Sequence, residues 1–129
     1  MPKVYVTKRS GFEACHHLIN YDGKCARNHG HSYKVEVTIS GSLSDYIGYD
    51  DLACEAMVMD FSFLKKLMNK AIVDKYDHTD LNLFFTHPTA EVMVVNMYND
   101  LKELLPERVH LECVKLWETE DSFAEYRGE

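Results

Sequence analysis

Residues 31–41 read HSYKVEVTISG, and apolar and polar side chains alternate through this stretch until Gly41 ends it. Successive side chains of a β-strand point to opposite faces, so the alternation predicts a strand with one buried and one solvated face. The buried face takes every second residue, namely Tyr33, Val35, Val37 and Ile39, and the solvated face takes Lys34, Glu36, Thr38 and Ser40. The stretch therefore predicts a half-buried sheet with other elements packed on its apolar face.

The start of this strand carries the sequence His29-Gly30-His31. Residues two positions apart in an extended chain share a face, so both imidazoles can reach one metal ion. Gly30 between them allows the backbone to approach closely. The alternative interpretation is that these are ordinary surface or core histidines. His87 and His110 lack ligand spacing, and we assign them no metal role.

A third metal ligand is available upstream, where His16 and His17 are adjacent. His16 shares its strand parity with Phe12 and Ala14, which favours it as the inward-facing histidine. His17 falls on the more polar face and stays the alternative. Three neutral imidazoles would hold a tetrahedral Zn2+ ion with one open position, which is typical of catalytic rather than structural zinc.

Helical spacing of apolar residues predicts two helices after the strand. The first begins at Phe61 behind Asp60, a suitable N-cap, and its apolar positions recur to Ile72. Pro88 opens the second helix within its first turn, and Pro106 ends it. The buried stripe of this second helix is expected to consist of Val94, Met97, Tyr98, Leu101, Leu104 and Leu105.

Further strands are predicted on both sides of the helices. Residues 3–8 form a strand that residues 10–17 extend or repeat, and residues 109–118 form a final long strand. Residues 57–59 suggest a short strand, whereas residues 42–57 suggest a loop or hairpin connection and residues 76–88 a loop. This order predicts an α+β fold in which the helices pack on one face of an antiparallel β-sheet.

Bulk composition bounds the class of protein. A length of 129 residues suits one domain spanning residues 1–129, and 46% apolar residues support a core. The formal net charge of -7 disfavours general nucleic-acid binding, although local cations can still bind a small anionic substrate. No apolar run approaches the roughly 20 residues of a membrane span. The first residues lack the apolar stretch of a signal peptide, so we expect a cytoplasmic protein.

Cys25 is the candidate for a reactive thiol. It lies in a polar loop between Lys24 and Arg27, two cations that would favour the thiolate. The alternative is a plain loop cysteine. The remaining cysteines lie in or beside apolar segments and are expected to be core thiols: Cys15, Cys54 and Cys113. No CxxC pair is present, which argues against a thiolate zinc ribbon.

Two acidic positions are further candidates for chemistry. Asp77 precedes His78, and a carboxylate beside an imidazole can orient it for proton transfer. By themselves these two residues favour the alternative, an ordinary capping or turn pair. Glu118 ends the last predicted strand, where a buried carboxylate could accept two hydrogen bonds from an amidine-like edge; otherwise it is a solvated strand end.

Together these motifs resemble the 6-pyruvoyltetrahydropterin synthase superfamily. The resemblance begins with FEACHHL at residues 12–18 and with Cys25, which precedes His29-Gly30-His31 after three residues. Other motifs follow in the same order: MDF (59–61), YDHTDLN (76–82), PTAE (88–91), WET (117–119) and YRGE (126–129). The short gap after Cys25 is similar to the bacterial and archaeal 6-carboxytetrahydropterin synthase branch. Residues 42–57 are longer than the usual connection in this family.

The resemblance implies a T-fold (tunnelling fold), in which trimeric barrels stack into a homohexamer. It implies His16, His29 and His31 as zinc ligands. It further implies that Cys25 abstracts a proton and that Asp77 and His78, from a neighbouring subunit, are its acid–base partners. The pterin ring would be anchored by Glu118 with the help of Thr89, Glu91 and Thr119.

The implied reaction converts 7,8-dihydroneopterin triphosphate and water to 6-carboxy-5,6,7,8-tetrahydropterin, acetaldehyde and triphosphate, on the way to queuosine and other 7-deazaguanines. Lys24 and Arg27 are candidates for contacting the triphosphate. One alternative is a pyruvoyl-type or other pterin side-chain lyase, which the short gap after Cys25 disfavours. The other alternative is a non-enzymatic zinc-binding module.

Overall fold

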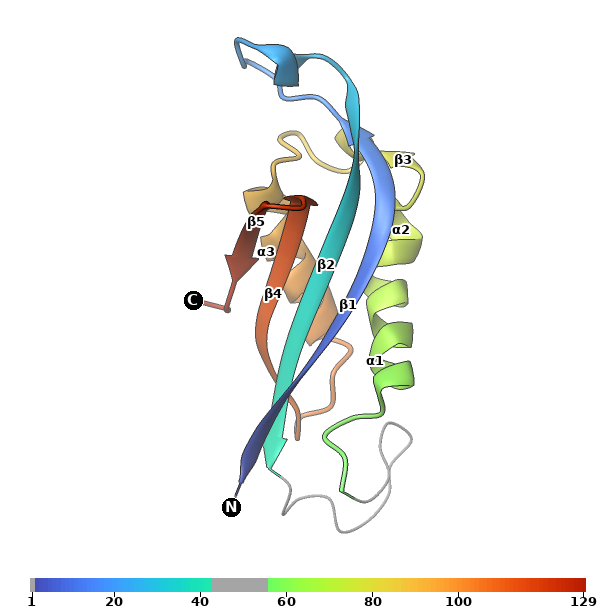
Figure 1. Ribbon diagram of the computed structural model, residues 1–129, viewed down its shortest axis with the longest axis vertical. Coiled ribbons are helices and arrows are strands. Elements are labelled where there is room, and N and C mark those ends of the chain that lie inside the picture. Colours follow the sequence, from blue (N-terminus) through green and yellow to red (C-terminus); the bar gives the residue numbers. More distant parts are fainter. Residues whose placement is uncertain (1, 43–55) are drawn as a thin grey trace.

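The computed structural model describes residues 2–42 and 56–129. It shows a five-stranded sheet with helices on one face (Figure 1). The strand order across the sheet is β3-β1-β2-β4-β5. All neighbouring strands run antiparallel except β3, which runs parallel to β1. The strands are β1 (Lys3–His16), β2 (His29–Ser42), β3 (Thr79–Asp80), β4 (His110–Thr119) and β5 (Ser122–Tyr126). The α+β prediction is confirmed, with one short parallel pair added to the antiparallel sheet.

The hairpin of β1 and β2 is the long axis of the molecule (Figure 1). Its register is continuous from the pair Lys3 and Ser42 to the pair His16 and His29. The alternation in β2 places its apolar face inward as predicted, because Tyr33, Val35, Val37 and Ile39 are fully buried. Residues 10–16 therefore extend the first strand rather than forming a second one, and the strand ends one residue before the predicted limit.

The first helix begins where it was predicted. α1 (Phe61–Met68) continues through a π-helical turn (Asn69–Val73) into α2 (Asp74–Tyr76). Asp60 caps it, because its carboxylate accepts a 2.8 Å hydrogen bond from the amide of Ser62.

The second helix, α3 (Ala90–Lys102), differs from the prediction at both ends. Thr89 is the N-cap, since its hydroxyl accepts from the amide of Val92 at 3.2 Å, so Pro88 precedes the helix instead of opening its first turn. The helix ends at Lys102, before Pro106, and Leu104 and Leu105 lie beyond it as half-buried side chains.

Three strand predictions need correction. Residues 57–59 form no strand: Val58 and Met59 are buried in the core, and the Val58 carbonyl accepts from Arg108 instead of a neighbouring strand. The predicted 76–88 loop contains β3, and β5 follows the strand that was expected to be last. The 42–57 segment lies almost wholly outside the described residues, as does Cys54.

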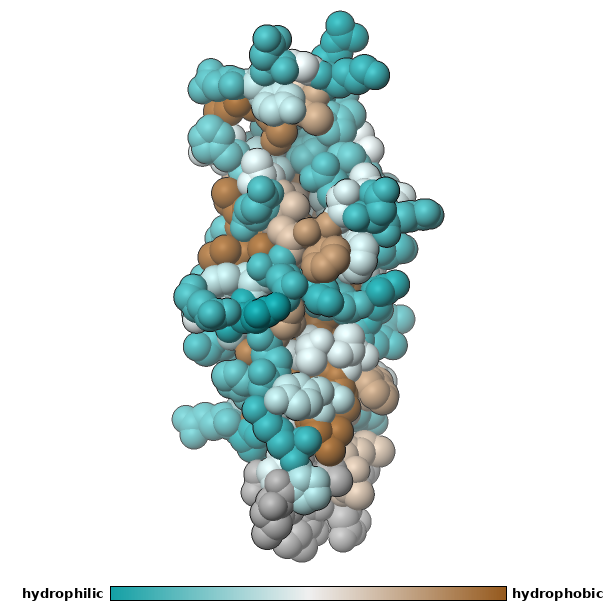
Figure 2. All heavy atoms as spheres, turned by 60° about the vertical axis from the view of Figure 1, so that its left-hand side comes forward, coloured by the Kyte–Doolittle hydropathy of each residue, from teal (hydrophilic) through white to brown (hydrophobic). Residues whose placement is uncertain are grey.

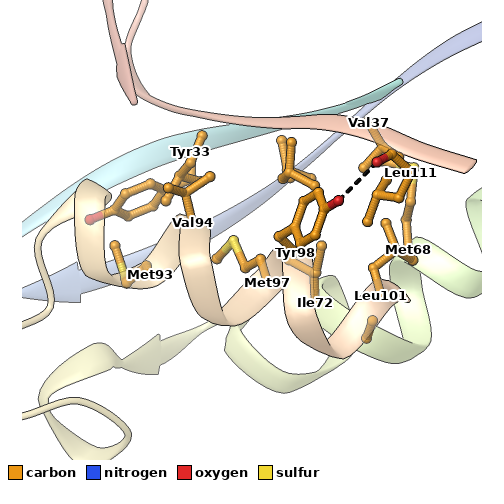
Figure 3. Packing of buried hydrophobic residues seen from close by; sticks show 14 of the residues in the cluster. Tyr33, Val37, Met68, Ile72, Met93, Val94, Met97, Tyr98, Leu101 and Leu111 are labelled. Atoms are coloured by element: carbon orange, nitrogen blue, oxygen red, sulfur yellow. Dashed lines mark hydrogen bonds between the residues drawn. The ribbon is translucent and has the colours of Figure 1, made fainter. Parts of the chain in front are cut away.

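The core lies between the sheet and the helices (Figure 3). α3 contributes a stripe of buried side chains, of which Met93, Met97 and Leu101 are fully buried. The Tyr98 hydroxyl satisfies its hydrogen bond inside the core by donating to the carbonyl of Leu111 at 2.9 Å. The surface in Figure 2 is mainly hydrophilic, with hydrophobic side chains interspersed. No helix among residues 2–42 and 56–129 is long and apolar enough to cross a membrane.

The packing of α3 generates a stability prediction. Leu101→Ala removes a fully buried side chain, so the free energy of unfolding should fall by about 2–5 kcal/mol. Urea denaturation at a fixed protein concentration measures it. The control is Val95→Ala on the same helix, which is 36% exposed and should cost about 0.5 kcal/mol or less. Equal losses in both variants would contradict the assigned core face.

Candidate metal centre and active site

Three histidines meet at the end of the β1–β2 hairpin where its connecting loop begins and ends. His16 and His29 form its last residue pair, and His31 lies opposite Ala14, two positions along. Directly opposed residues of antiparallel strands share a face, which brings the three rings together. The ring centroids are 4.6 Å apart for His16 and His29, 5.1 Å for His16 and His31, and 4.9 Å for His29 and His31. One nitrogen from each ring lies within 4.8 Å of the other two, close enough to bind one ion.

Backbone carbonyls orient two of these imidazoles. Nδ1 of His16 lies 2.7 Å from the carbonyl oxygen of Pro88, and Nδ1 of His29 lies 2.7 Å from that of Arg27. A carbonyl oxygen only accepts, so each Nδ1 carries a proton and donates it, which leaves Nε2 as the nitrogen that can face a metal ion. Nε2 of His16 is buried without a hydrogen-bond partner. This is the second-sphere arrangement that metal-ligating histidines usually have.

His31 completes the cluster beside an acidic group. Its Nε2 lies 3.3 Å from a carboxylate oxygen of Glu118, but the geometry gives no hydrogen bond and the nitrogen is left without a partner. Burial lowers the pKa of His31, Glu118 partly opposes this, and the other two histidines lower the pKa further. The neutral imidazole is therefore favoured, which is the form that binds a metal ion. The three residues fit a Zn2+ site with protein ligands from one face of one hairpin.

Cys25 lies in the loop that joins β1 to β2, the two strands that carry the histidine cluster. It sits on the short 3-10 turn Lys24–Ala26 (η1) and is half-buried. Its carbonyl accepts a 2.7 Å hydrogen bond from the amide of Leu18. Both ends of this loop leave directly from the histidine cluster, because the loop joins His16 to His29. Lys24 and Arg27 are exposed on the same loop.

Asp77 and His78 form a bonded pair on the outer edge of β1. One carboxylate oxygen of Asp77 accepts from the amide of Glu13 at 2.9 Å, and the other lies 3.0 Å from Nδ1 of His78. The His78 amide donates to the carbonyl of Glu13, and its backbone has a φ of 59°, a conformation uncommon outside glycine. The His78 side chain is 79% exposed. None of the hydrogen bonds of this pair, in the described part of the chain, reaches Cys25 or the three histidines.

The other predicted site residues do not all line the same cavity. Glu118 and Glu91 line one cavity of about 480 Å³ at the start of α3. Thr119 lines a different cavity, of about 370 Å³, beside Trp117. Thr89 uses its hydroxyl as the N-cap of α3. Within one chain the structure therefore brings Glu91 and Glu118 together but not Thr119.

A third, open cavity of about 530 Å³ is lined by both His31 and His78. Cys15 also lines it, which corrects its prediction as a core thiol, since its side chain is only half-buried. Cys113 is likewise half-buried and not in the core. Partial burial raises the pKa of the Cys113 thiol to about 11, helped by its hydrogen bond to Glu125.

Sequence reasoning missed the groups that orient the predicted ones. These are the carbonyls of Pro88 and Arg27 and the backbone of Glu13. Every residue has a carbonyl and nearly every residue has an amide, so residue identity carries no signal for these contacts.

Comparisons with known proteins find relatives that match nearly the whole chain. Residues 5–129 match the family model described as 6-pyruvoyl tetrahydropterin synthase. The chain is 35% identical to a 6-carboxy-5,6,7,8-tetrahydropterin synthase of Haemophilus influenzae, covering 95% of this chain and 97% of the relative. It is 34% identical to a 6-pyruvoyl tetrahydrobiopterin synthase of Pongo abelii, covering 96% and 91%. The solved 6-pyruvoyl tetrahydropterin synthase of Caenorhabditis elegans superposes with a TM-score of 0.80 at 28% identity, covering 100% and 98%.

The Asp77–His78 pair generates a prediction about charge. Hydrogen bonds from the Glu13 amide and then from His78 hold the pKa of Asp77 below its ordinary value. In His78→Ala this pKa should rise, yet stay below the ordinary value because the Glu13 amide remains. Carboxyl ¹³C NMR titration measures it, and Asp121, whose pKa is lowered by Thr119 and Ser122, is the internal control. A complete return of Asp77 to its ordinary pKa would contradict the role of the hydrogen bond from the Glu13 amide.

Proposed function

This chain belongs to the 6-pyruvoyl tetrahydropterin synthase family, and on that premise we propose that it is a zinc-dependent lyase acting on a reduced pterin. The proposed reaction converts 7,8-dihydroneopterin triphosphate and water to 6-carboxy-5,6,7,8-tetrahydropterin, acetaldehyde and triphosphate, as a cytoplasmic step toward queuosine. The observation that carries the proposal is the cluster of three imidazoles, two with Nδ1 bonded to a carbonyl.

The carboxy product is favoured over the pyruvoyl product by one feature of the chain. Only three residues separate Cys25 from His29, a spacing that resembles the 6-carboxytetrahydropterin synthase branch. The Haemophilus influenzae relative carries that name. The second candidate is a pyruvoyl-type synthase, because the Pongo abelii relative of similar identity carries that name.

His16, His29 and His31 would hold the zinc ion through their Nε2 atoms. Bound there, zinc would supply a Lewis acid with an open position for the hydroxyls of the substrate side chain. The carbonyls of Pro88 and Arg27 keep two of the rings in the tautomer that this requires.

Proton transfer is assigned to Cys25 and to the Asp77–His78 pair. The Cys25 thiolate removes a carbon-bound proton from the substrate side chain. Asp77 accepts a hydrogen bond from Nδ1 of His78, which leaves Nε2 of His78 free to exchange protons. The Glu13 amide helps to keep Asp77 ionised, so this orientation persists.

The cavity that Glu118 lines at the start of α3 suits a pterin ring. Glu118 contacts His31 and shares its cavity with Glu91 and Glu125, so three glutamates line one pocket. Ionised carboxylates accept pairs of hydrogen bonds from guanidine-like edges, such as the amino-pyrimidine edge of a pterin. Thr89 and Thr119 are assigned supporting contacts to the ring, although within one chain Thr119 lines a different cavity and the Thr89 hydroxyl caps α3.

We place the complete site between subunits of a homohexamer. His78 is 79% exposed and Cys25 lies on a separate loop, so each can meet groups of another chain. In this arrangement the histidines and Cys25 of one subunit face the Asp77–His78 pair of a neighbour.

Product analysis tests the proposed reaction. The zinc-loaded protein should release acetaldehyde in step with triphosphate from 7,8-dihydroneopterin triphosphate, detected with a coupled alcohol dehydrogenase assay and by mass spectrometry. A 6-pyruvoyl product without acetaldehyde would favour the second candidate. The absence of any turnover by the zinc-loaded protein would favour a zinc-binding module.

Two substitutions separate the metal ligands from the proton-transfer group. Cys25→Ala should keep a full equivalent of zinc and lose about 10²–10⁴-fold in kcat, because the ligand set stays whole. His29→Ala should release the metal during dialysis, because only two imidazoles remain. Zinc content is measured by inductively coupled plasma mass spectrometry. Zinc loss in Cys25→Ala, or full retention in His29→Ala, would contradict these roles.

Mixing two inactive variants tests whether subunits share the site. Cys25→Ala and His78→Ala, mixed in equal amounts after reversible dissociation, should recover about a quarter of the wild-type sites, because random pairing joins an intact Cys25 with an intact His78 at that frequency. Each variant alone, treated identically, is the control. No recovery in verified mixed oligomers would show that both groups act within one chain.

A further inference from the structure

Asn82 makes two side-chain hydrogen bonds to one residue of the loop that follows β1. It lies in the short 3-10 turn Leu81–Leu83 (η4) that follows β3. Its Oδ1 accepts from the amide of His17 at 2.9 Å, and its Nδ2 donates to the carbonyl of His17 at 3.1 Å. The backbone amide of Asn82 donates to Asp80 at 3.0 Å, which fixes the turn itself. One side-chain amide thus satisfies both backbone groups of His17.

These two bonds continue the sheet beyond its last strand pairing. β3 is only two residues long, and its pairing with β1 ends at Cys15 and Asp80. β1 itself ends at His16. The side chain of Asn82 replaces the missing strand neighbour for the next residue, His17, so the backbone stays held one residue past the ligand-bearing end of β1.

His17 joins the two functional parts of the site. The residue before it, His16, belongs to the histidine cluster. The residue after it, Leu18, donates its amide to the carbonyl of Cys25 at 2.7 Å. The Leu18–Cys25 bond is the only one, among the described residues, that ties the main chain of Cys25 to the start of its loop. His17, which Asn82 holds, lies between this bond and the histidine cluster.

We propose that Asn82 is a positioning residue that sets the Cys25 turn relative to the histidine cluster. The role rests on the proposed function, in which Cys25 acts on substrate bound at that cluster. Asn82 acts through the backbone of His17. The His17 ring lies 3.5 Å from Nδ2 of Asn82, at the limit of a hydrogen bond, and is not needed for this role.

The chemistry of the side chain explains why an asparagine serves here. An amide presents one acceptor and two donors in a single plane, so it can pair with an amide and a carbonyl of the same residue. An aspartate keeps the acceptor, loses the donor and places a negative charge beside the His17 carbonyl. An alanine removes both bonds. The series Asn, Asp, Ala therefore predicts a graded loosening of the loop.

The experiment follows the Cys25 thiol and the turnover separately in zinc-loaded protein. Asn82→Ala should make alkylation of Cys25 by iodoacetamide about tenfold faster, because two hydrogen bonds that oppose local opening are lost. Peptide mapping resolves Cys25 from Cys113, which serves as the internal reference. In the same variant kcat should fall about 10²-fold, with a smaller change in KM and with zinc retained, because Cys25 is displaced from its working position. Asn82→Asp should lie between wild type and Asn82→Ala in both readouts.

The control is Asn96→Ala. The Asn96 amide donates to the carbonyl of Val92 at 3.0 Å on the exposed side of α3, so its loss should leave both readouts unchanged. Unchanged Cys25 labelling in Asn82→Ala would overturn the proposal. Full recovery of kcat on adding excess zinc would also overturn it, because Asn82 would then act only by keeping His16 in place to bind the metal. If Asn82→Ala does not fold, the Asn82→Asp labelling rate decides in the same way. If the wild-type protein shows no turnover, the proposed function is refuted. The labelling rate of Cys25 would still test whether Asn82 holds the Cys25 turn in place.

Discussion

The pairing of β1 with β2 places His16 opposite His29, and the site depends on this register. A slip of one residue would turn every side chain of one strand to the other face. His16 would then leave the helix-covered face, and His29 and His31 would lose their third partner. The alternation in β2 prevents the slip, because its four fully buried residues would be moved into water. The hydrophobic core and the histidine cluster are therefore specified by the same register.

The helices take part in the site through their packing and through one backbone atom. The carbonyl of Pro88, just ahead of the α3 cap Thr89, accepts from His16. The buried stripe of α3 holds that helix against β4, so the carbonyl stays in reach of the imidazole. Loss of packing far along α3 would move a hydrogen-bond acceptor of the candidate ligand. Pro88 therefore links the packing of α3 in the core to the orientation of His16.

Acidic and basic side chains lie in different parts of the candidate site. Glu91 and Glu118 share a cavity, and Glu118 also contacts His31; paired carboxylates suit a ligand edge rich in N–H donors. Lys24 and Arg27 are exposed on the Cys25 loop, where they can meet the anionic part of a substrate. An overall net charge of -7 is compatible with such a substrate because the cations are local.

The sequence by itself determined the α+β class, the buried face of β2, the Asp60 cap and the residue types of the site, because periodicity and side-chain chemistry are local properties. It also favoured His16 over His17 by strand parity. It did not determine β5 or the two-residue β3, because short half-exposed strands exist through pairing with a neighbour. Only the tertiary structure decided which backbone groups orient His16 and Asp77, and that Thr119 lines a different cavity from Glu118. These contacts join residues up to 72 positions apart through groups that nearly every residue carries, so only the fold can select among them.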